Sequence, residues 1–427
     1  MRIRHRFLLG VYALLVAAII MPRSGGVSAQ APSGGRTLIP FDASWRFTHT
    51  DAGNAAMPAF DDSAWRQVEV PHDWSAEGPF SAEFGSGNGY APGGIGWYRK
   101  HFTLDAGLRG KVVTLEFDGV YDHSEVWING HLVCGRPYGY SSFDCPVTPY
   151  ARFGTADNVV AVRVDHSRFA DSRWYTGSGI YRHVRLRVTD PVRIARYGTF
   201  VTTPTVTVDA AVVKIETTIE NDADGTPAFE LRSDIRLGTA VVASNGMTSN
   251  IGAHGRQTVM QTLTIPKPAR WDIDSPTLYT LHQRLEPSKT SGFIDEVDTP
   301  FGVRSTRFDP QKGFVLNDQP IKLKGVCVHH DAGSLGAAVP GAVWESRLRA
   351  LKALGVNAIR TSHNPPAPEF LDVCDRLGLL VKDEAFDEFT PAKNKWVAGW
   401  NAGVPSRFGY AESFEQWSVI DAGDMVR

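Results

Sequence analysis

The sequence has no excess of positive charge and no basic cluster along most of its length. Of its 427 residues, 44 are Lys or Arg and 46 are Asp or Glu, and no run of Lys or Arg occurs beyond the extreme N-terminus. A surface that binds nucleic acid needs such a cluster to contact the phosphate backbone. The composition therefore predicts no nucleic-acid partner.

Long apolar runs are also missing, with one exception near the N-terminus. Residues 7–20, FLLGVYALLVAAII, follow the basic stretch MRIRHR and are too few to span a bilayer comfortably. Residues 27–29, VSA, then form a small-residue cleavage pattern. We expect residues 1–29 to be a signal peptide and the protein to be exported, to the periplasm or outside the cell, without membrane contact after cleavage. An uncleaved membrane anchor is the alternative.

Only four cysteines are present, and no CxxC or HxxxH spacing predicts a structural zinc site. Export permits disulfides, and Cys134 and Cys145 are close enough in sequence for a short-loop bond. Cys327 lies in an apolar strand and Cys374 on an apolar helix face. We expect these last two to be ordinary buried thiols.

Helical spacing is almost absent from residues 37–190, where short apolar or alternating runs are separated by turns. Such runs are 111–120, 123–133, 158–166 and 181–190. Asn129-Gly130 is a strong signal for a two-residue hairpin. A length of about 150 residues favours a jelly-roll β-sandwich.

Residues 191–302 form a second strand-rich stretch. The segments 214–221, 229–237, 257–265 and 277–285 are expected strands, and residues 244–255, SNGMTSNIGAHG, are an expected turn. A length near 110 residues suits an immunoglobulin-like β-sandwich.

From residue 303 to 427 strands alternate with helices. The expected strands are 321–328, 356–362 and 379–386. The first helix places Trp344, Leu348, Leu351 and Leu354 on one face, and the second places Phe370, Leu371, Cys374 and Leu377 together. Short links between alternating strands and helices predict a parallel sheet with covered faces. Residues 418–427 read as the start of a further helix.

Polar and titratable residues follow each of these three strands. They are 329–331, 360–364, and the pairs 383–384 and 387–388. In parallel α/β folds, functional groups gather at the carboxyl ends of the strands. Polar loops are common, but three consecutive strands ending in this way predict a binding site that includes Arg360, His363 and Asn364.

Several motifs in the same order resemble the family 2 glycoside hydrolases, which include β-galactosidases, β-glucuronidases and β-mannosidases. The motifs are RWYTGSGIYRHVRL, VWINGHLV, FGVRSTRFDPQKGF, LNDQPIKLKGVCVHHD and NAIRTSHNPPAPEFLDVCDRLGLLVKDEAFDE. The resemblance covers the chain from about residue 40 to its end. It implies a jelly-roll sugar-binding domain over 37–190, an immunoglobulin-like domain over 191–302, and the first three βα units of a TIM (β/α)8 barrel over 303–427.

The resemblance also implies residues that contact a carbohydrate substrate. His329 closes the first barrel strand, and Arg360 and His363 follow the second, at positions that line the family's sugar site. Glu384 is an expected polar support for that site. An aspartate of the jelly roll also reaches the site in this family, and Asp165 is its best match, with a turn aspartate as the alternative.

Other residues near these motifs receive different interpretations. Trp174 and Tyr175 are expected to form a packing corner rather than a platform for sugar. Some family members bind Mg²⁺ near a Glu and a His after the third strand. Glu388 matches the Glu, but Phe389 and Thr390 supply no His, so the sequence assigns no cofactor and leaves Mg²⁺ at Glu388 open as an alternative.

The family's retaining chemistry uses two glutamates at the ends of the fourth and seventh barrel strands. Three barrel strands are recognised here, so neither catalytic glutamate is expected before Arg427. The leading interpretation is an exported glycosidase of β-galactosidase type. The alternatives are a β-glucuronidase, a β-mannosidase, or a non-catalytic carbohydrate-binding protein, and the sequence leaves open whether it forms a homo-oligomer.

Overall fold

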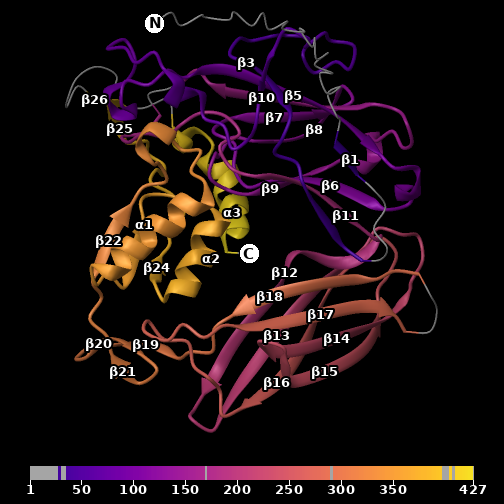
Figure 1. Ribbon diagram of the computed structural model, residues 1–427, viewed down its shortest axis with the longest axis vertical. Coiled ribbons are helices and arrows are strands. Elements are labelled where there is room, and N and C mark those ends of the chain that lie inside the picture. The colour runs from indigo at the N-terminus through magenta and orange to yellow at the C-terminus, as the bar shows by residue number, and fades with distance from the viewer. Residues whose placement is uncertain are drawn as a thin grey trace, which may run out of the picture.

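The computed structural model describes residues 27–29, 35–168, 171–288, 292–396, 403–405 and 409–426. Residues 1–26, which hold most of the predicted signal peptide, lie outside the described residues. Two β-rich units lie one above the other in Figure 1, and an α/β portion lies beside both of them. Within the described residues, no helix is long and apolar enough to cross a membrane.

The first unit is a sandwich of two sheets, as predicted. One sheet has the order β4-β3-β5-β10-β7-β8, with β1 beside β5, and the other has the order β2-β11-β6-β9. Its core is formed by residues of both sheets, such as Trp45, Leu115 and Val162, which are buried. The strands are β1 Val27–Ala29, β2 Thr37–Pro40, β3 Trp45–Thr48, β4 Arg66–Val68, β5 Gly94–Leu104, β6 Val112–Phe117, β7 Ser124–Ile128, β8 His131–Arg136, β9 Phe143–Pro146, β10 Asn158–His166 and β11 Val184–Thr189.

The predicted hairpin is present between β7 and β8. These strands pair antiparallel, and the two residues between them have positive φ angles, 51° at Asn129 and 88° at Gly130. Asn and Gly tolerate this backbone conformation better than other residues, which is why the pair predicts a tight hairpin.

A disulfide joins the two sheets of this sandwich. Cys134 lies on β8 and Cys145 on β9, and their Cα atoms are 5.5 Å apart. This separation is within the usual range for a disulfide. Because β8 and β9 belong to different sheets, the bond connects the two layers at one side of the sandwich.

The second unit is also a two-sheet sandwich, with orders β12-β13-β16 and β15-β14-β17-β18. The turn expected over 244–255 is wrong in its first half, because β15 continues to Asn250. This strand lies at a sheet edge and alternates exposed with half-buried residues, so it lacks an apolar signal. The strands are β12 Val192–Val206, β13 Ala210–Asn221, β14 Ala228–Leu237, β15 Ala240–Asn250, β16 Arg256–Pro266, β17 Tyr279–Pro287 and β18 Asp295–Phe301.

The α/β portion contains a parallel sheet of three strands, β22-β23-β24, preceded by a small antiparallel sheet, β19-β20-β21. Helices α1 and α2 pack on one face of the parallel sheet, where Leu348, Ile359 and Phe370 are buried together. The strands and helices are β19 Thr306–Asp309, β20 Gly313–Leu316, β21 Gln319–Pro320, β22 Gly325–Val328, β23 Ala358–Thr361, β24 Leu380–Lys382, α1 Gly341–Ala353 and α2 Pro368–Leu377.

Two expectations for this portion are wrong. Leu354 is 82% exposed, because α1 ends at Ala353 and Leu354 is its C-terminal cap rather than part of its apolar face. Cys327 is exposed instead of buried, because it lies on β22 on the face of the sheet opposite to α1 and α2. Cys374 is buried, as predicted.

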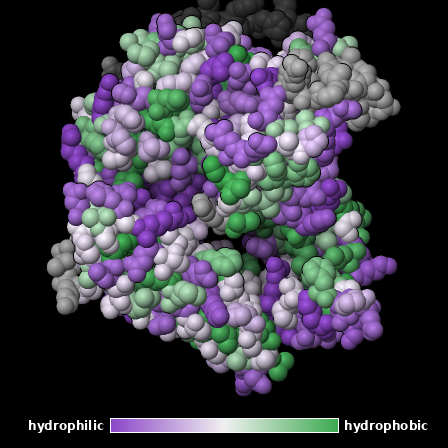
Figure 2. Space-filling model, turned by 180° about the vertical axis from the view of Figure 1, so that it is seen from behind, coloured by the Kyte–Doolittle hydropathy of each residue, from purple (hydrophilic) through white to green (hydrophobic). Residues whose placement is uncertain are grey.

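The last helix, α3 Phe414–Met425, packs against the jelly roll rather than on the three-stranded sheet. Arg136 of β8 forms ion pairs with Asp421 at 3.1 Å and with Asp424 at 2.8 Å. A short antiparallel pair, β25 Asn394–Trp396 and β26 Gly403–Pro405, precedes it. On the face seen in Figure 2, hydrophobic residues form separate patches among hydrophilic ones.

Candidate functional site

Three predicted site residues meet where β23 and β24 end. Arg360, the third residue of β23, donates to Glu384 at 2.5 Å and lies 3.2 Å from Nδ1 of His363. The same His363 nitrogen is 3.3 Å from Glu384. Burial would raise the pKa of Glu384, but hydrogen bonding to Arg360 and the nearby His363 outweigh it and lower that pKa. Glu384 is therefore held as a carboxylate that orients both neighbours.

An aromatic side chain from the jelly roll lies against this group. The Trp174 ring is 5.0 Å from the His363 ring and 5.9 Å from the His329 ring, and the two histidine rings are 5.3 Å apart. Trp174 therefore contacts two predicted site residues, which the expectation of a packing corner did not include. Tyr175 is a packing residue, since its hydroxyl donates to Asp73 at 2.6 Å.

The pKa of His329 is lowered, first by burial and then by the neighbouring His363. A neutral imidazole is therefore favoured at this position near pH 7. His329 Nδ1 is buried without a hydrogen-bond partner among the described residues. A neutral histidine with a free ring nitrogen can donate to or accept from a hydroxyl group, which is the contact a sugar offers.

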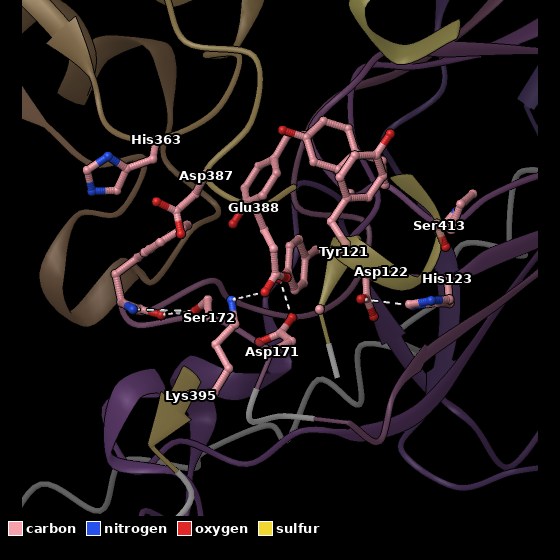
Figure 3. A pocket seen from close by; sticks show the side chains of 17 residues that line it. Tyr121, Asp122, His123, Asp171, Ser172, His363, Asp387, Glu388, Lys395 and Ser413 are labelled. Carbon is pink, nitrogen blue, oxygen red and sulfur yellow. Dashed lines mark hydrogen bonds and ion pairs between the residues drawn. The ribbon is translucent and has the colours of Figure 1, made fainter. Parts of the chain in front are cut away.

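A pocket opens beside this group between the jelly roll and the α/β portion (Figure 3). His363 and Asp387 line it from the α/β portion, and Trp174, Asp122 and Asp171 line it from the jelly roll. Aromatic and carboxylate side chains together suit a sugar, whose C–H faces pack on rings while its hydroxyl groups donate to carboxylates.

Two carboxylates of the jelly roll that line the pocket each have one oxygen without a hydrogen-bond partner among the described residues. Asp122 Oδ1 and Asp171 Oδ1 are buried and lack a hydrogen-bond partner among the described residues. The hydroxyl of Tyr121 donates to the other oxygen of Asp171, and His123 lies 2.9 Å from Asp122. Unpaired buried acceptors are costly, so these oxygens favour a ligand or water that donates to them.

Asp165, the predicted aspartate of the jelly roll, lies apart from His363. Its carboxylate accepts from Arg163 at 3.1 Å and from the Ser167 hydroxyl at 2.6 Å, and it faces a different surface hollow. The Ser167 contacts are those of a turn aspartate, which was the alternative interpretation. Asp171, six residues further along, lines the pocket with His363 instead.

Asn364 also lies away from His363, behind the strand ends. It is 3% exposed and lines a small cavity of about 20 Å³ together with Ser362, His330 and Glu369. Each of these four side chains has one buried atom without a partner among the described residues. A cavity of this size and polarity is suited to a bound water molecule. Asn364 therefore contributes to the support of the second strand's end.

Glu388 does not fit a magnesium site. Its Oε1 is 3.2 Å from Nζ of Lys395, and both side chains are buried. An ammonium group in contact with the carboxylate occupies the place that a cation would need. Among the described residues, no group of three or more His, Cys, Asp or Glu is arranged to hold a metal ion.

The sequence identified the strand-end residues but missed most of the jelly-roll side of the pocket. Asp122 and Asp171 could not be found from the carboxyl ends of parallel strands, because the main sheets of the jelly roll are built from antiparallel pairs. The stretch 171–174, DSRW, was the available signal, because two polar residues and an aspartate beside a tryptophan are unusual for a packing corner. None of the described residues of the site is matched to either catalytic glutamate.

Three sequence models of one family match consecutive parts of the chain. The sugar binding domain of glycosyl hydrolases family 2 matches residues 39–191, a second model of family 2 matches 192–304, and the family 2 TIM barrel domain matches 310–399. Together they account for most of the chain, in the order that the fold shows.

Several relatives of the chain are named as glycosidases. The β-galactosidase BoGH2A of Bacteroides ovatus is 42% identical over 94% of this chain and 46% of its own length. A β-glucuronidase of Bacteroides fragilis is 29% identical over 81% of this chain and 48% of its own length. The chain thus spans about half the length of the curated relatives it matches.

Solved structures agree with these matches. A glycosyl hydrolase family 2 member from Bacteroides cellulosilyticus superposes with a TM-score of 0.84 at 38% identity, over 91% of this chain and 49% of that one. A β-glycosidase from Bacteroides vulgatus gives a TM-score of 0.81 at 37% identity, over 91% of this chain and 48% of that one. With the fold, the order of its units and three sequence models in agreement, the chain belongs to glycoside hydrolase family 2.

Proposed function

We propose that the protein is an exported glycosidase that removes terminal β-galactosyl residues with retention of configuration. In this proposal the described pocket is the sugar-binding half of the active site. The acid/base and nucleophilic glutamates are contributed by parts of the protein other than residues 1–427. The observation that carries the proposal is the contact of Trp174 with His363 and His329 at the carboxyl ends of β22 and β23.

The geometry supports a role in binding and orienting the sugar ring. The Trp174 ring offers an apolar face to the C–H side of a sugar. His363, held by Glu384 and Arg360, can donate to a hydroxyl or to charge that develops on the ring oxygen. Fixed donors of this kind act most strongly in the transition state, because they need no rearrangement as charge appears.

Galactose is proposed as the sugar because the 42% identical relative is named a β-galactosidase. A β-glucuronidase is the second candidate, since other relatives of this chain carry that name. The two differ in one chemical demand, because a glucuronidase must bind a carboxylate on the sugar. Arg173 lies between two pocket-lining residues in the sequence, but its guanidinium group is already within 3.4 Å of both oxygens of Asp387.

The test is an assay of two proteins, one of residues 30–427 and one extended through a complete eight-stranded barrel. We expect the extended protein to hydrolyse nitrophenyl β-galactoside faster than the β-glucuronide and the β-mannoside. We expect the first product to keep the β configuration at its anomeric carbon. We expect no turnover by residues 30–427. Among the described residues, one edge of β24 has no partner strand, and neither catalytic carboxylate is matched.

Each result has a distinct meaning. Preference for the glucuronide would replace the galactosidase proposal by its second candidate. Turnover by residues 30–427 that is lost in Glu384→Gln or Glu388→Gln would place the chemistry in the loop after β24. An inactive extended protein that still binds galactosides would favour a carbohydrate-binding role without catalysis.

A further inference from the structure

The loop that follows β24 carries two acidic residues, and each is matched by a lysine a few residues later. Asp387 lies 2.9 Å from Nζ of Lys393, and Glu388 lies 3.2 Å from Nζ of Lys395. The two pairs differ in their surroundings. The Lys393 side chain is 33% exposed, whereas the side chains of Lys395 and Glu388 are only 2% and 4% exposed.

The Glu388 carboxylate is surrounded by donors from two separate segments. Besides Lys395, its Oε1 accepts from the backbone N–H of Lys393 at 3.1 Å, and its Oε2 accepts from that of Ala411 at 3.5 Å. A Cβ atom at Gly409 would lie 1.8 Å from Oε2, so a larger residue at this position would require the carboxylate to move. The carboxylate therefore occupies a close-fitting cradle that the chain builds around it.

A buried carboxylate needs a positive charge close to it, because its transfer from water is otherwise strongly unfavourable. Lys395 supplies that charge within the pocket wall, where Figure 3 shows its side chain reaching Glu388. A lysine at this distance also excludes a divalent ion, which would require the same oxygen and would be repelled by the ammonium group.

We infer that Lys395 is a built-in cation for Glu388, so that this wall of the pocket is held without a metal ion. The inference goes beyond the proposed function, because it concerns what holds the pocket and not which sugar enters it. Lys395 is a positioning residue: it fixes the loop that carries Asp387, and Asp387 lines the pocket together with His363. Its ammonium group links β25 to Glu388 in this loop. Glu388 in turn contacts Ala411, in the segment that begins at Gly409.

The experiment measures thermal unfolding of the extended protein in EDTA and in millimolar MgCl₂, for the parent and for K395M, E388Q and the K395M/E388Q double variant. Lys393→Met is the matched control, since it removes the more exposed pair. We expect the parent's midpoint to be equal in both solutions. We expect the unfolding midpoint of K395M to lie about 5 °C or more below that of the parent, because the substitution leaves a buried carboxylate unpaired. The midpoint of K393M should fall much less.

The double variant separates pairing from packing. If Lys395 acts through the charge of Glu388, the double variant loses less stability than the sum of the two single variants. Additive losses would overturn the inference, and so would a parent midpoint that falls in EDTA or rises in MgCl₂. If K395M does not fold, the unfolding midpoint of the parent in EDTA and in MgCl₂ still tests whether a metal ion holds this wall of the pocket. None of these readouts depends on glycosidase activity, so a failure here is distinct from a failure of the proposed function.

Discussion

The jelly roll and the three-stranded sheet both contribute to the pocket, but they hold their residues differently. The jelly roll buries its core between two sheets, so both inner faces are covered. Among the described residues, the helices that cover the three-stranded sheet, α1 and α2, both lie on one of its faces. Cys327 on β22 is exposed on its other face, and Arg360 on β23 reaches to within 3.8 Å of that sulfur.

The difference shows in what fixes each functional side chain. In the jelly roll, Tyr121 is buried and holds Asp171 through its hydroxyl, so this carboxylate is fixed by a side chain of the packed interior. In the three-stranded sheet, Arg360, His363 and Glu384 hold one another through polar contacts. We therefore expect core changes in the jelly roll to affect stability most, and changes at the strand ends to affect catalysis with little effect on stability.

The first prediction compares leucines in the two regions. Leu115 lies between the two jelly-roll sheets and Leu348 on α1, and both are 0% exposed, whereas Leu354 is 82% exposed. We expect Leu115→Ala to lower the free energy of unfolding by about 4–5 kcal/mol and Leu348→Ala by about 2–3 kcal/mol. The loss is smaller at Leu348 because alanine is more favourable in a helix than in a strand, and because side chains beside α1 can move more easily into the cavity that the substitution leaves.

Leu354→Ala is the matched control and should change stability by less than about 0.5 kcal/mol. Urea unfolding followed by far-ultraviolet circular dichroism measures all three variants. Equal losses for Leu115→Ala and Leu348→Ala would show that the one-sided sheet is packed as firmly as the sandwich, which would remove the basis of the comparison.

The second prediction concerns His363 at the strand ends. In the extended protein, His363→Ala should lower kcat/KM, because a donor fixed by Glu384 is lost. The fall should correspond to about 2–4 kcal/mol of lost transition-state stabilisation. The midpoint of thermal unfolding should stay near that of the parent. His254→Ala, in a loop of the second sandwich where the side chain is 64% exposed, is the control. Activity within about threefold of the parent would make His363 a structural residue.

The order of units and the strand-end residues could be predicted from the sequence, because both depend on local pattern. Alternation, the Asn129-Gly130 pair and polar strand ends each leave a signal within a few residues. The exposure of Cys327 could not be predicted in this way. Its strand is apolar, and whether the opposite face is covered depends on tertiary packing rather than on the strand itself.

The contacts between distant segments were also beyond the sequence pattern. Asp171 joins His363 in the pocket from 192 residues away, and the approach depends on how the jelly roll docks. Lys395 and Glu388 are close in sequence, but their pairing required the loop to turn back on itself. The resemblance matched Glu388 to a glutamate near the family's Mg²⁺ site, and only the structure shows that Lys395 contacts its carboxylate.

The third prediction tests the link between the jelly-roll sheets. Replacing both Cys134 and Cys145 by serine should lower the free energy of unfolding by about 2–3 kcal/mol, from the chain entropy of a loop with a sequence separation of 11. Cys327→Ser, at an exposed thiol, is the control and should leave stability nearly unchanged. A double variant as stable as the parent would show that the disulfide does not stabilise the sandwich.

The smallest expected effect is a pH dependence at the jelly-roll side of the pocket. His123 lies 2.9 Å from Asp122, and the negative charge of Asp122 raises the pKa of His123 to about 9. Arg168 opposes this rise and Asp165 adds to it, but both act less strongly than Asp122. The pair therefore stabilises the fold while His123 is protonated.

Because the pKa of His123 is higher in the folded protein than in the unfolded chain, where it is about 6.5, its stabilisation is complete below pH 6.5. It is lost as the pH rises through about 9. Unfolding free energies measured between pH 6 and pH 10 should fall further for the parent than for His123→Gln, which has no such charge to lose. The difference should stay below about 1 kcal/mol, because the His123 side chain is 40% exposed and water screens the pair. Parallel pH profiles for the two proteins would show that Asp122 is balanced by another group, with His166 the nearest candidate on the buried side.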